Sequence, residues 1–325
     1  MKDRHNRLIN YLRISVTDRC NLRCVYCMPS DGIKPVRHKD ILSYEEIIRI
    51  VRIATSLGVQ KIRITGGEPL VRRNLSYLIS SIDKIEGIED ISLTTNGQLL
   101  KQHIENLAMA GLKRVNISLD SLDPERYRSI TRGGDIKKVL AGIEKTASLG
   151  LLPIKINMVP VRGFNDDEIE NFANLSITTP YHIRFIEFMP IGAKDFWQPD
   201  RYISTDEIKK RLSGLAPLNP VKIKKSGPAS YYKYDNAKGL IGFISPVSNH
   251  FCDSCNRLRL TSEGKIMPCL FSETEIDLKS AMRAGAKDAE IERLLKLSIE
   301  IKPSGHSVNE EVALEHFKPI SKIGG

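Results

Sequence analysis

Residues 12–27 read Leu-Arg-Ile-Ser-Val-Thr-Asp-Arg-Cys-Asn-Leu-Arg-Cys-Val-Tyr-Cys, a short apolar segment followed at once by a loop with three cysteines. The β-branched residues of 12–16 predict a buried strand. The cysteines then lie at the carboxyl end of that strand, where parallel α/β sheets gather their chemistry. We therefore expect an α/β fold whose functional residues lie at this edge of the sheet.

The same strand pattern recurs five more times before residue 190, alternating with helical patterns. The expected strands span residues 12–16, 62–65, 91–95, 115–119, 153–159 and 182–188, and the expected helices span 44–57, 75–82, 102–110, 136–149 and 167–175. Gly58, Gly111 and Gly150 lie where helix C-caps are expected. Six βα units are too few for a closed eight-stranded barrel. The predicted fold is α/β, a partial (β/α)6 TIM-like barrel.

The pattern changes after residue 190. A short helix is expected near 205–212, strands near 230–234 and 240–245, a hairpin of 258–261 and 265–267, and helices near 277–284 and 286–297. No low-complexity linker separates this part from the first. We expect two units, a partial barrel of residues 1–190 and a C-terminal α+β region of residues 191–325 that covers the open side of the barrel.

Composition narrows the class of protein. The 325 residues are 41% hydrophobic and 27% charged, close to globular averages. No apolar run approaches the roughly 18 residues of a membrane span, and no signal-peptide core follows the N-terminus. The net charge of +10 suits an anionic partner such as a nucleotide, a nucleic acid or a membrane surface. We expect a soluble, cytoplasmic protein.

All six cysteines fall into two groups of three, and none is left over. The first triad is Cys20, Cys24 and Cys27, with CxxxCxxC spacing. In a cytoplasmic chain such clusters indicate metal or redox chemistry rather than disulfides, and soft thiolates select iron–sulfur or zinc. A zinc site of these cysteines completed by His38 is the alternative.

The second triad is Cys252, Cys255 and Cys269. A zinc ribbon is the alternative here, with His250 the nearest fourth ligand. A structural zinc site is normally closed by four ligands, whereas three cysteines beside arginines indicate a site with one position open to substrate. Arg257 and Arg259 supply those cations.

The CxxxCxxC loop after the first strand resembles the signature of the radical S-adenosylmethionine superfamily. A second match is Thr65-Gly66-Gly67-Glu68-Pro69 after the second strand. The resemblance implies that the first triad binds a 4Fe-4S cluster whose fourth iron is chelated by S-adenosylmethionine, which is then cleaved to a 5′-deoxyadenosyl radical. It also implies contacts to that cofactor from Tyr26, Gly67, Ser118 and Met189.

Over nearly the whole chain the sequence is similar to the GTP 3′,8-cyclase family of molybdenum-cofactor biosynthesis. The resemblance implies a second 4Fe-4S cluster on the second triad, whose open iron faces the guanine of GTP. The residues that match the family's substrate contacts are Arg13, Arg63, Thr94, Lys155, Arg184, Arg257 and Arg259. Four of these cations interrupt apolar strands, so they are expected to point into the barrel. The terminal Gly324-Gly325 also matches the family.

The implied reaction converts GTP to 3′,8-cyclo-7,8-dihydro-GTP, with Arg13 as the candidate for assisting the last reduction or protonation. The implied partners are an external electron donor and the pterin synthase that takes the product, and the chain would be a monomer or a homodimer. A radical enzyme modifying a peptide or a tRNA is one alternative, although no cysteines remain for further clusters. A metal-stabilised nucleic-acid binder is the other, but no RNA-binding module is evident.

Overall fold

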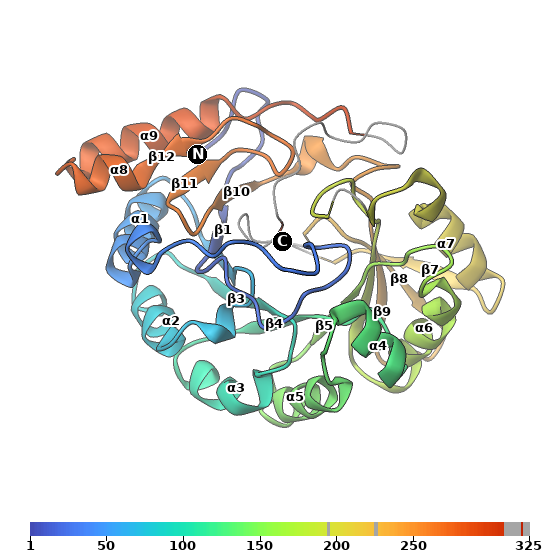
Figure 1. Ribbon diagram of the computed structural model, residues 1–325. Coiled ribbons are helices and arrows are strands. Elements are labelled where there is room, and N and C mark those ends of the chain that lie inside the picture. Colours follow the sequence, from blue (N-terminus) through green and yellow to red (C-terminus); the bar gives the residue numbers. More distant parts are fainter. Residues whose placement is uncertain (194–195, 224–226, 309–319, 321–325) are drawn as a thin grey trace.

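A single sheet organises the computed structural model, which describes residues 1–193, 196–223, 227–308 and 320. Its strand order is β12-β11-β10-β1-β2-β3-β4-β5-β6-β9-β8-β7. The central strands are parallel and curve around an interior, with the helices outside them (Figure 1). The six N-terminal strands are β1 (Tyr11–Ser15), β2 (Lys61–Thr65), β3 (Asp90–Thr95), β4 (Arg114–Ser118), β5 (Lys155–Met158) and β6 (His182–Ile186). The predicted α/β class is confirmed.

The helices between these strands form the outer layer of the barrel. They are α1 (Tyr44–Ser56), α2 (Leu75–Asp83), α3 (Leu100–Met109), α4 (Pro124–Thr131), α5 (Ile136–Ser148) and α6 (Ile169–Thr178). Each presents an apolar stripe to the sheet, and α1 begins with a full capping box between Ser43 and Glu46. Helix α4 is absent from the sequence prediction, because only Tyr127, Ile130 and Thr131 of its eight residues are buried and its apolar periodicity is weak.

The C-terminal part contributes the remaining strands and helices. These are α7 (Thr205–Ser213), β7 (Leu218–Val221), β8 (Ser230–Tyr234), β9 (Leu240–Ile244), β10 (Arg257–Leu260), β11 (Lys265–Met267), β12 (Ile276–Asp277), α8 (Leu278–Arg283) and α9 (Asp288–Glu300). Helix α9 packs beside α1 (Figure 1). The predicted hairpin is the antiparallel pair of β10 and β11.

This part does more than cover an open side, because it extends the sheet at both edges. Strand β10 pairs in parallel with β1, and β9 pairs in parallel with β6. Eight neighbouring strands therefore run parallel, two more than the sequence predicts. Within the described residues β9 and β10 are not paired with each other, so the barrel remains open.

Two predicted strands are shorter than expected. The segment expected at 153–159 is a strand only over β5, because Pro153 has no N–H for the ladder and the Val159 N–H donates instead to the Asp120 carboxylate. The segment expected at 182–188 ends as β6 at Ile186. The Glu187 carboxylate accepts hydrogen bonds from the backbone N–H groups of Val247 and Ser248. In both cases the residue that follows the strand forms hydrogen bonds with a loop at the carboxyl edge of the sheet.

The alternation along each strand separates two environments. In β1, Leu12 and Ile14 face the helices and are fully buried in the main apolar core, whereas Tyr11, Arg13 and Ser15 face the interior of the barrel. The polar side chains of the site are thus carried by a rigid frame. Among the described residues, none of the helices is both long and apolar enough to span a membrane.

Candidate functional site

One cavity runs through the barrel and is lined by every residue that the sequence proposed as a cluster ligand or as a contact to the cofactor or substrate. These residues are Arg13, Cys20, Cys24, Tyr26, Cys27, Arg63, Gly67, Thr94, Ser118, Lys155, Arg184, Met189, Cys252, Cys255, Arg257, Arg259 and Cys269. Ile320 also lines the cavity, whereas Gly324 and Gly325 lie outside the described residues.

The two cysteine triads, more than 220 positions apart in the sequence, therefore open into the same space. The first triad lies at the carboxyl edge of the parallel strands. The second triad lies at the amino ends of β10 and β1, so the expectation that all functional residues gather at the carboxyl edge is wrong for these three cysteines.

The loop of the first triad is held from two sides. The backbone N–H groups of Arg23 and Val25 donate to the carbonyls of Thr131 and Ile130 at the end of α4, at 3.1 and 3.0 Å. On the other side, the Asn96 side chain donates to the Asn21 side-chain oxygen at 2.9 Å, and within the loop the Cys20 sulfur accepts the N–H of Leu22 at 3.4 Å. Helix α4 is therefore a support for the cysteine loop.

The Gly66-Gly67-Glu68 turn lies directly against the same loop. A Cβ atom on Gly67 would lie 2.4 Å from the Arg19 carbonyl oxygen, and one on Gly66 would lie 2.7 Å from that of Thr17. Only glycine permits these contacts. The Gly67 N–H donates to the Thr17 carbonyl at 2.7 Å, and the Glu68 N–H donates to the Arg19 carbonyl at 2.8 Å. The glycines thus seat the turn on the cysteine loop.

The Glu68 carboxylate is fully buried and organises the end of β3. It accepts hydrogen bonds from the Thr95 hydroxyl at 2.8 Å and from the N–H groups of Asn96 and Leu70 at 2.7 and 3.0 Å. Burial raises the pKa of Glu68 to about 7, although these hydrogen bonds oppose the increase. The Asn96 side chain in turn donates to the Cys20 sulfur at 3.7 Å.

Tyr26 and Asp120 connect the first triad to β4. The Tyr26 hydroxyl donates to one Asp120 oxygen at 2.5 Å, and the Val159 N–H donates to the other at 2.9 Å. Burial raises the pKa of Asp120 to about 6 and the pKa of Tyr26 well above its usual range. These contacts fix the Tyr26 ring beside Cys24 and Cys27.

Between the triads, arginines form a row across three strands. Arg259, Arg13 and Arg63 occupy the same register position on β10, β1 and β2, so they project from the same face about 4.8 Å apart along the sheet. Arg13 and Arg259 are only 8% and 7% exposed. Burial and these neighbours hold the pKa of Arg13 well below its usual range, and burial lowers that of Arg259 to about 10.

Cations outnumber carboxylates in the lining of this cavity, although Arg114 pairs with Asp90 outside it. Nine lysine and arginine side chains line it, and among the described residues Asp120 is the sole carboxylate that does so. Burial and the nearby Arg184, Arg114 and Arg63 lower the pKa of Lys155 to about 6. An anion with several negative charges would relieve this repulsion, whereas a neutral ligand would not.

Neutral groups hold and complete the cationic wall. Arg184 is 4% exposed and donates to the side-chain oxygens of Asn157 at 2.8 Å and Asn116 at 2.7 Å. These amides fix the direction of the guanidinium without neutralising it. The buried Thr94 hydroxyl makes no hydrogen bond with any described residue, so it is available to a ligand.

The second triad begins in a short 3₁₀ turn, Cys252–Ser254, and lies beside cations. Burial alone would raise the pKa of Cys255, but Arg257 and Lys302 overcome it and lower that pKa to about 6. Burial raises the pKa of Cys24 in the first triad well above the usual range, and Cys27 and Asp120 add to the increase. Cys24 and Cys255 therefore lie in opposite electrostatic environments, although burial raises the pKa of Cys252 in the second triad.

The geometry tests the zinc alternatives. A single tetrahedral zinc holds its sulfur ligands about 3.8 Å apart, from a Zn–S distance near 2.3 Å. Among the described residues, neither cysteine triad has its three sulfur atoms within 4.8 Å of one another, and His38 joins no such group. The donor set of three soft thiolates in each triad therefore carries the preference for an iron–sulfur cluster.

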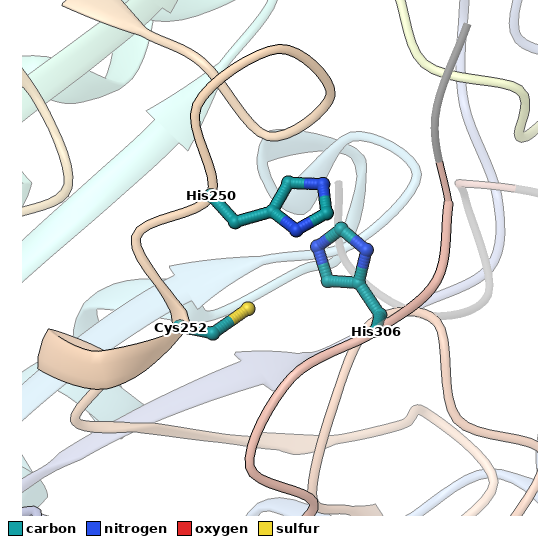
Figure 2. A group of neighbouring side chains, drawn as sticks. All are labelled: His250, Cys252 and His306. Atoms are coloured by element: carbon teal, nitrogen blue, oxygen red, sulfur yellow. The ribbon is translucent and has the colours of Figure 1, made fainter.

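His250, which the sequence suggested as a fourth zinc ligand, approaches Cys252 together with His306 (Figure 2). The ligand atoms of these three residues lie within 4.8 Å of one another, but Cys255 and Cys269 do not belong to the group. The two rings lie against each other with centroids 4.2 Å apart, and His250 Nε2 is 3.0 Å from the Val308 carbonyl oxygen. The alternative of a zinc ribbon made of three cysteines and His250 is therefore not formed among the described residues.

Several residues of the site were not found from the sequence. Glu68 belongs to the Gly66-Gly67-Glu68-Pro69 motif, and Asp120 lies two positions after Ser118, so the sequence could have indicated both residues. Asn116 and Asn157 lie within predicted strands and carried no signal of their own. Lys302 lies beyond the last expected helix, at 286–297, and only the tertiary structure brings it to the second triad.

Two family models match consecutive parts of the chain. The Radical SAM superfamily model matches residues 14–176, and the Molybdenum Cofactor Synthesis C model matches residues 181–308. The solved structure of Streptococcus suis SuiB bound to S-adenosylmethionine is similar in fold, with a TM-score of 0.62 and 16% identity over 89% of this chain and 69% of that chain.

Curated relatives match over the full length. The GTP 3′,8-cyclase of Thermodesulfovibrio yellowstonii is 53% identical over 330 residues, and that of Syntrophomonas wolfei is 52% identical over 326 residues. The GTP 3′,8-cyclase of Alkaliphilus metalliredigens is 50% identical over 325 residues. In all three comparisons the match covers 100% of both chains.

The different surroundings of Cys24 and Cys255 predict that their thiols react at different rates in the reduced, metal-free chain. At pH 7, iodoacetamide should alkylate Cys255 at least about tenfold faster than Cys24, because only the former is largely thiolate at that pH. The rate at Cys255 should fall as the pH drops below about 6. Mass mapping of the alkylated peptides measures both rates.

A matched pair of variants checks the cause. Arg257→Gln should slow alkylation of Cys255, whereas Arg293→Gln, on the exposed face of α9, should not. Equal rates at Cys24 and Cys255 in the parent chain would contradict the electrostatic account.

Proposed function

The chain belongs to the GTP 3′,8-cyclase family of radical S-adenosylmethionine proteins, and on that premise we propose that it converts GTP to 3′,8-cyclo-7,8-dihydro-GTP. This reaction is the first step of molybdenum-cofactor biosynthesis. The observation that carries the proposal is a single cavity in which buried cations separate two triads of cysteines. A polyanionic substrate fits between two metal sites in such a cavity.

The first triad would hold a 4Fe-4S cluster and S-adenosylmethionine. Cys20, Cys24 and Cys27 are the proposed ligands, and the contacts to S-adenosylmethionine are proposed for Tyr26, Gly67, Ser118 and Met189, which all line the same end of the cavity. The hydrogen bond to Asp120 fixes the Tyr26 ring in place for the adenine side of the cofactor. Gly67 keeps its turn close to the cysteine loop, where the methionyl group would bind.

The second triad would hold a second 4Fe-4S cluster beside the substrate. Cys252, Cys255 and Cys269 are the proposed ligands. The proposed GTP contacts are Arg13, Arg63, Thr94, Lys155, Arg184, Arg257 and Arg259. Arginine suits this task because its planar fork binds phosphate oxygens in pairs and stays charged when buried.

When bound, the first cluster with S-adenosylmethionine supplies a carbon-centred radical, and the second supplies an open iron for the guanine base. The chain's own residues position the reactants. The arginine row binds the triphosphate, and the fixed Arg184 guanidinium gives the substrate one orientation. The surrounding barrel excludes water from the ribose, and Arg13 is the proposed donor of a proton or hydrogen bond to the product as it is reduced.

Further proposals concern the surroundings of the enzyme. We propose that it works in the cytoplasm as a monomer or homodimer, takes electrons from an external donor and passes its product to a pterin synthase. We also propose that residues 1–190 form the unit for S-adenosylmethionine and that residues 191–325 complete the GTP site. The GTP contacts of both parts meet across β10 and β1, where Arg259 lies beside Arg13.

The activity is tested with the iron–sulfur-reconstituted protein under anaerobic conditions. Incubation with S-adenosylmethionine, dithionite and GTP should yield 5′-deoxyadenosine and a cyclised GTP isomer, both detected by mass spectrometry. Replacing the first triad with alanine should abolish both products. Replacing the second triad should abolish the cyclised product and leave 5′-deoxyadenosine. Deoxyadenosine without GTP conversion in the parent would mean another substrate, such as a peptide or a tRNA.

Arg13→Ala tests the proposed catalytic residue. Conversion of GTP should fall on the order of 100-fold, because a positioned proton donor contributes about that much or more, while 5′-deoxyadenosine still forms. Product analysis of both compounds under the same anaerobic conditions makes the comparison. Arg37→Ala, on an exposed side chain, is the control. Full conversion by Arg13→Ala with both clusters intact would remove Arg13 from the mechanism.

The lowered pKa of Lys155 predicts that GTP binding is coupled to the uptake of a proton. The pKa of this lysine is about 6 in the free cavity, so at pH 7.5 it is mostly neutral. A bound triphosphate raises that pKa, and the lysine takes a proton from solvent. Titration calorimetry in buffers of different ionisation enthalpy should reveal this uptake, and GTP affinity should weaken as the pH rises above 6. Lys155→Met should lose the buffer dependence, and Lys101→Met should keep it.

A further inference from the structure

Lys302 is a buried cation that neither the site motifs nor the proposed reaction uses. It lies just after α9 and is only 3% exposed. Its Nζ donates to the Arg257 carbonyl at 3.0 Å and to the Pro268 carbonyl at 2.5 Å. Pro268 immediately precedes Cys269, and Arg257 follows Cys255 by two positions. One ammonium group thus joins the two chain segments that carry these cysteines.

The same short segment also reaches the remaining cysteine of the second triad. The Arg7 guanidinium donates to the carbonyls of Pro303 at 2.6 Å and Ser304 at 3.0 Å, and also to the Cys252 carbonyl at 2.9 Å. The backbone N–H of His306 donates to the Cys252 sulfur. Segment 302–306 is therefore fastened at all three cysteines of the second triad.

Charge distinguishes the surroundings of the two triads. The groups beside the first triad include the carboxyl groups of Glu68 and Asp120, which act against the ionisation of Cys20 and Cys24. Arg257 and Lys302 lie beside the second triad and favour the thiolate of Cys255. Reduction adds an electron to a cluster, and a fixed positive charge nearby stabilises the reduced form.

We propose that Lys302 is a positioning residue of the second iron–sulfur site, which holds the segments of Cys255 and Cys269 together and whose positive charge raises the reduction potential of the cluster bound there. This inference rests on the proposed second cluster. It adds a residue outside the recognised motifs and assigns it a measurable electrostatic effect. Arg7 fixes the lysine's own segment and so keeps the ammonium in place.

The experiment isolates the second cluster in the full-length chain. Cys20, Cys24 and Cys27 are replaced by alanine, so that only the second triad can bind iron, and the protein is reconstituted anaerobically. Iron and sulfide per chain are measured, and a redox titration followed by electron paramagnetic resonance gives the reduction potential. Lys302→Gln keeps hydrogen-bond donors without charge, Lys302→Arg keeps the charge, and Lys296→Met on the exposed side of α9 is the control.

We expect Lys302→Gln to shift the potential to a more negative value or to lose the cluster's iron, while Lys302→Arg and Lys296→Met stay near the parent. An unchanged potential and iron content in Lys302→Gln would overturn the inference, and so would equal displacement by Gln and Arg, which indicates packing alone. If the parent with an intact Lys302 holds no cluster, the proposed second cluster fails and this inference fails with it. Circular dichroism of each variant establishes that it is folded. Where Lys302→Arg does not fold, Lys302→Gln is compared with Lys302→Met. Equal negative shifts of the reduction potential in both variants support the effect of the charge, and a shift in Lys302→Met alone contradicts it.

Discussion

Repulsion among buried cations is the constraint on which the rest of this site depends. Arg259, Arg13 and Arg63 lie in register on adjacent strands, and burial denies Arg13 and Arg259 most of the screening that water would provide. Such an arrangement is unfavourable in the empty protein and can persist only because the surrounding sheet is rigid and its outer face is packed against helices. The strain is released when a polyanion binds. The stable barrel holds the cations close together before the substrate binds, and this raises the affinity for a charged substrate. No rearrangement is needed at the moment of binding.

The two cysteine triads are held in place by different kinds of contact. The first triad is held by backbone contacts from α4 and from the glycine turn, and its polar neighbours include the carboxyl groups of Glu68 and Asp120. The second is held by the side chains of Arg7 and Lys302. The two groups of three cysteines therefore have differently charged neighbours within one cavity. A reduction potential depends on charge and hydrogen bonding around the sulfurs, so this difference would give the two proposed clusters different potentials.

Much of this arrangement could be predicted from the sequence, because the signals were local. CxxxCxxC and the glycine turn are short motifs, and cations such as Arg13 stand out within apolar strands whose alternation fixes their direction. The parallel pairings of β9 with β6 and of β10 with β1 carried no such signal, since β9 directly follows β8 in an antiparallel pair and a loop precedes β10. Lys302 was missed for a related reason. A lysine in a polar segment after a helix is usually solvated, and only the long-range contact with Pro268 buries it.

The pairing of β1 with β10 also determines when this protein can become complete during synthesis. The first strand leaves the ribosome among the earliest residues, but its partner begins at Arg257. Until then one backbone edge of β1 has no neighbour, and an unpaired apolar strand invites association with other chains. The nascent barrel must therefore wait for the last third of the polypeptide, and a contact of such long sequence separation forms slowly. A chain that is released before residue 252 therefore lacks both the neighbour of β1 and the second triad of cysteines.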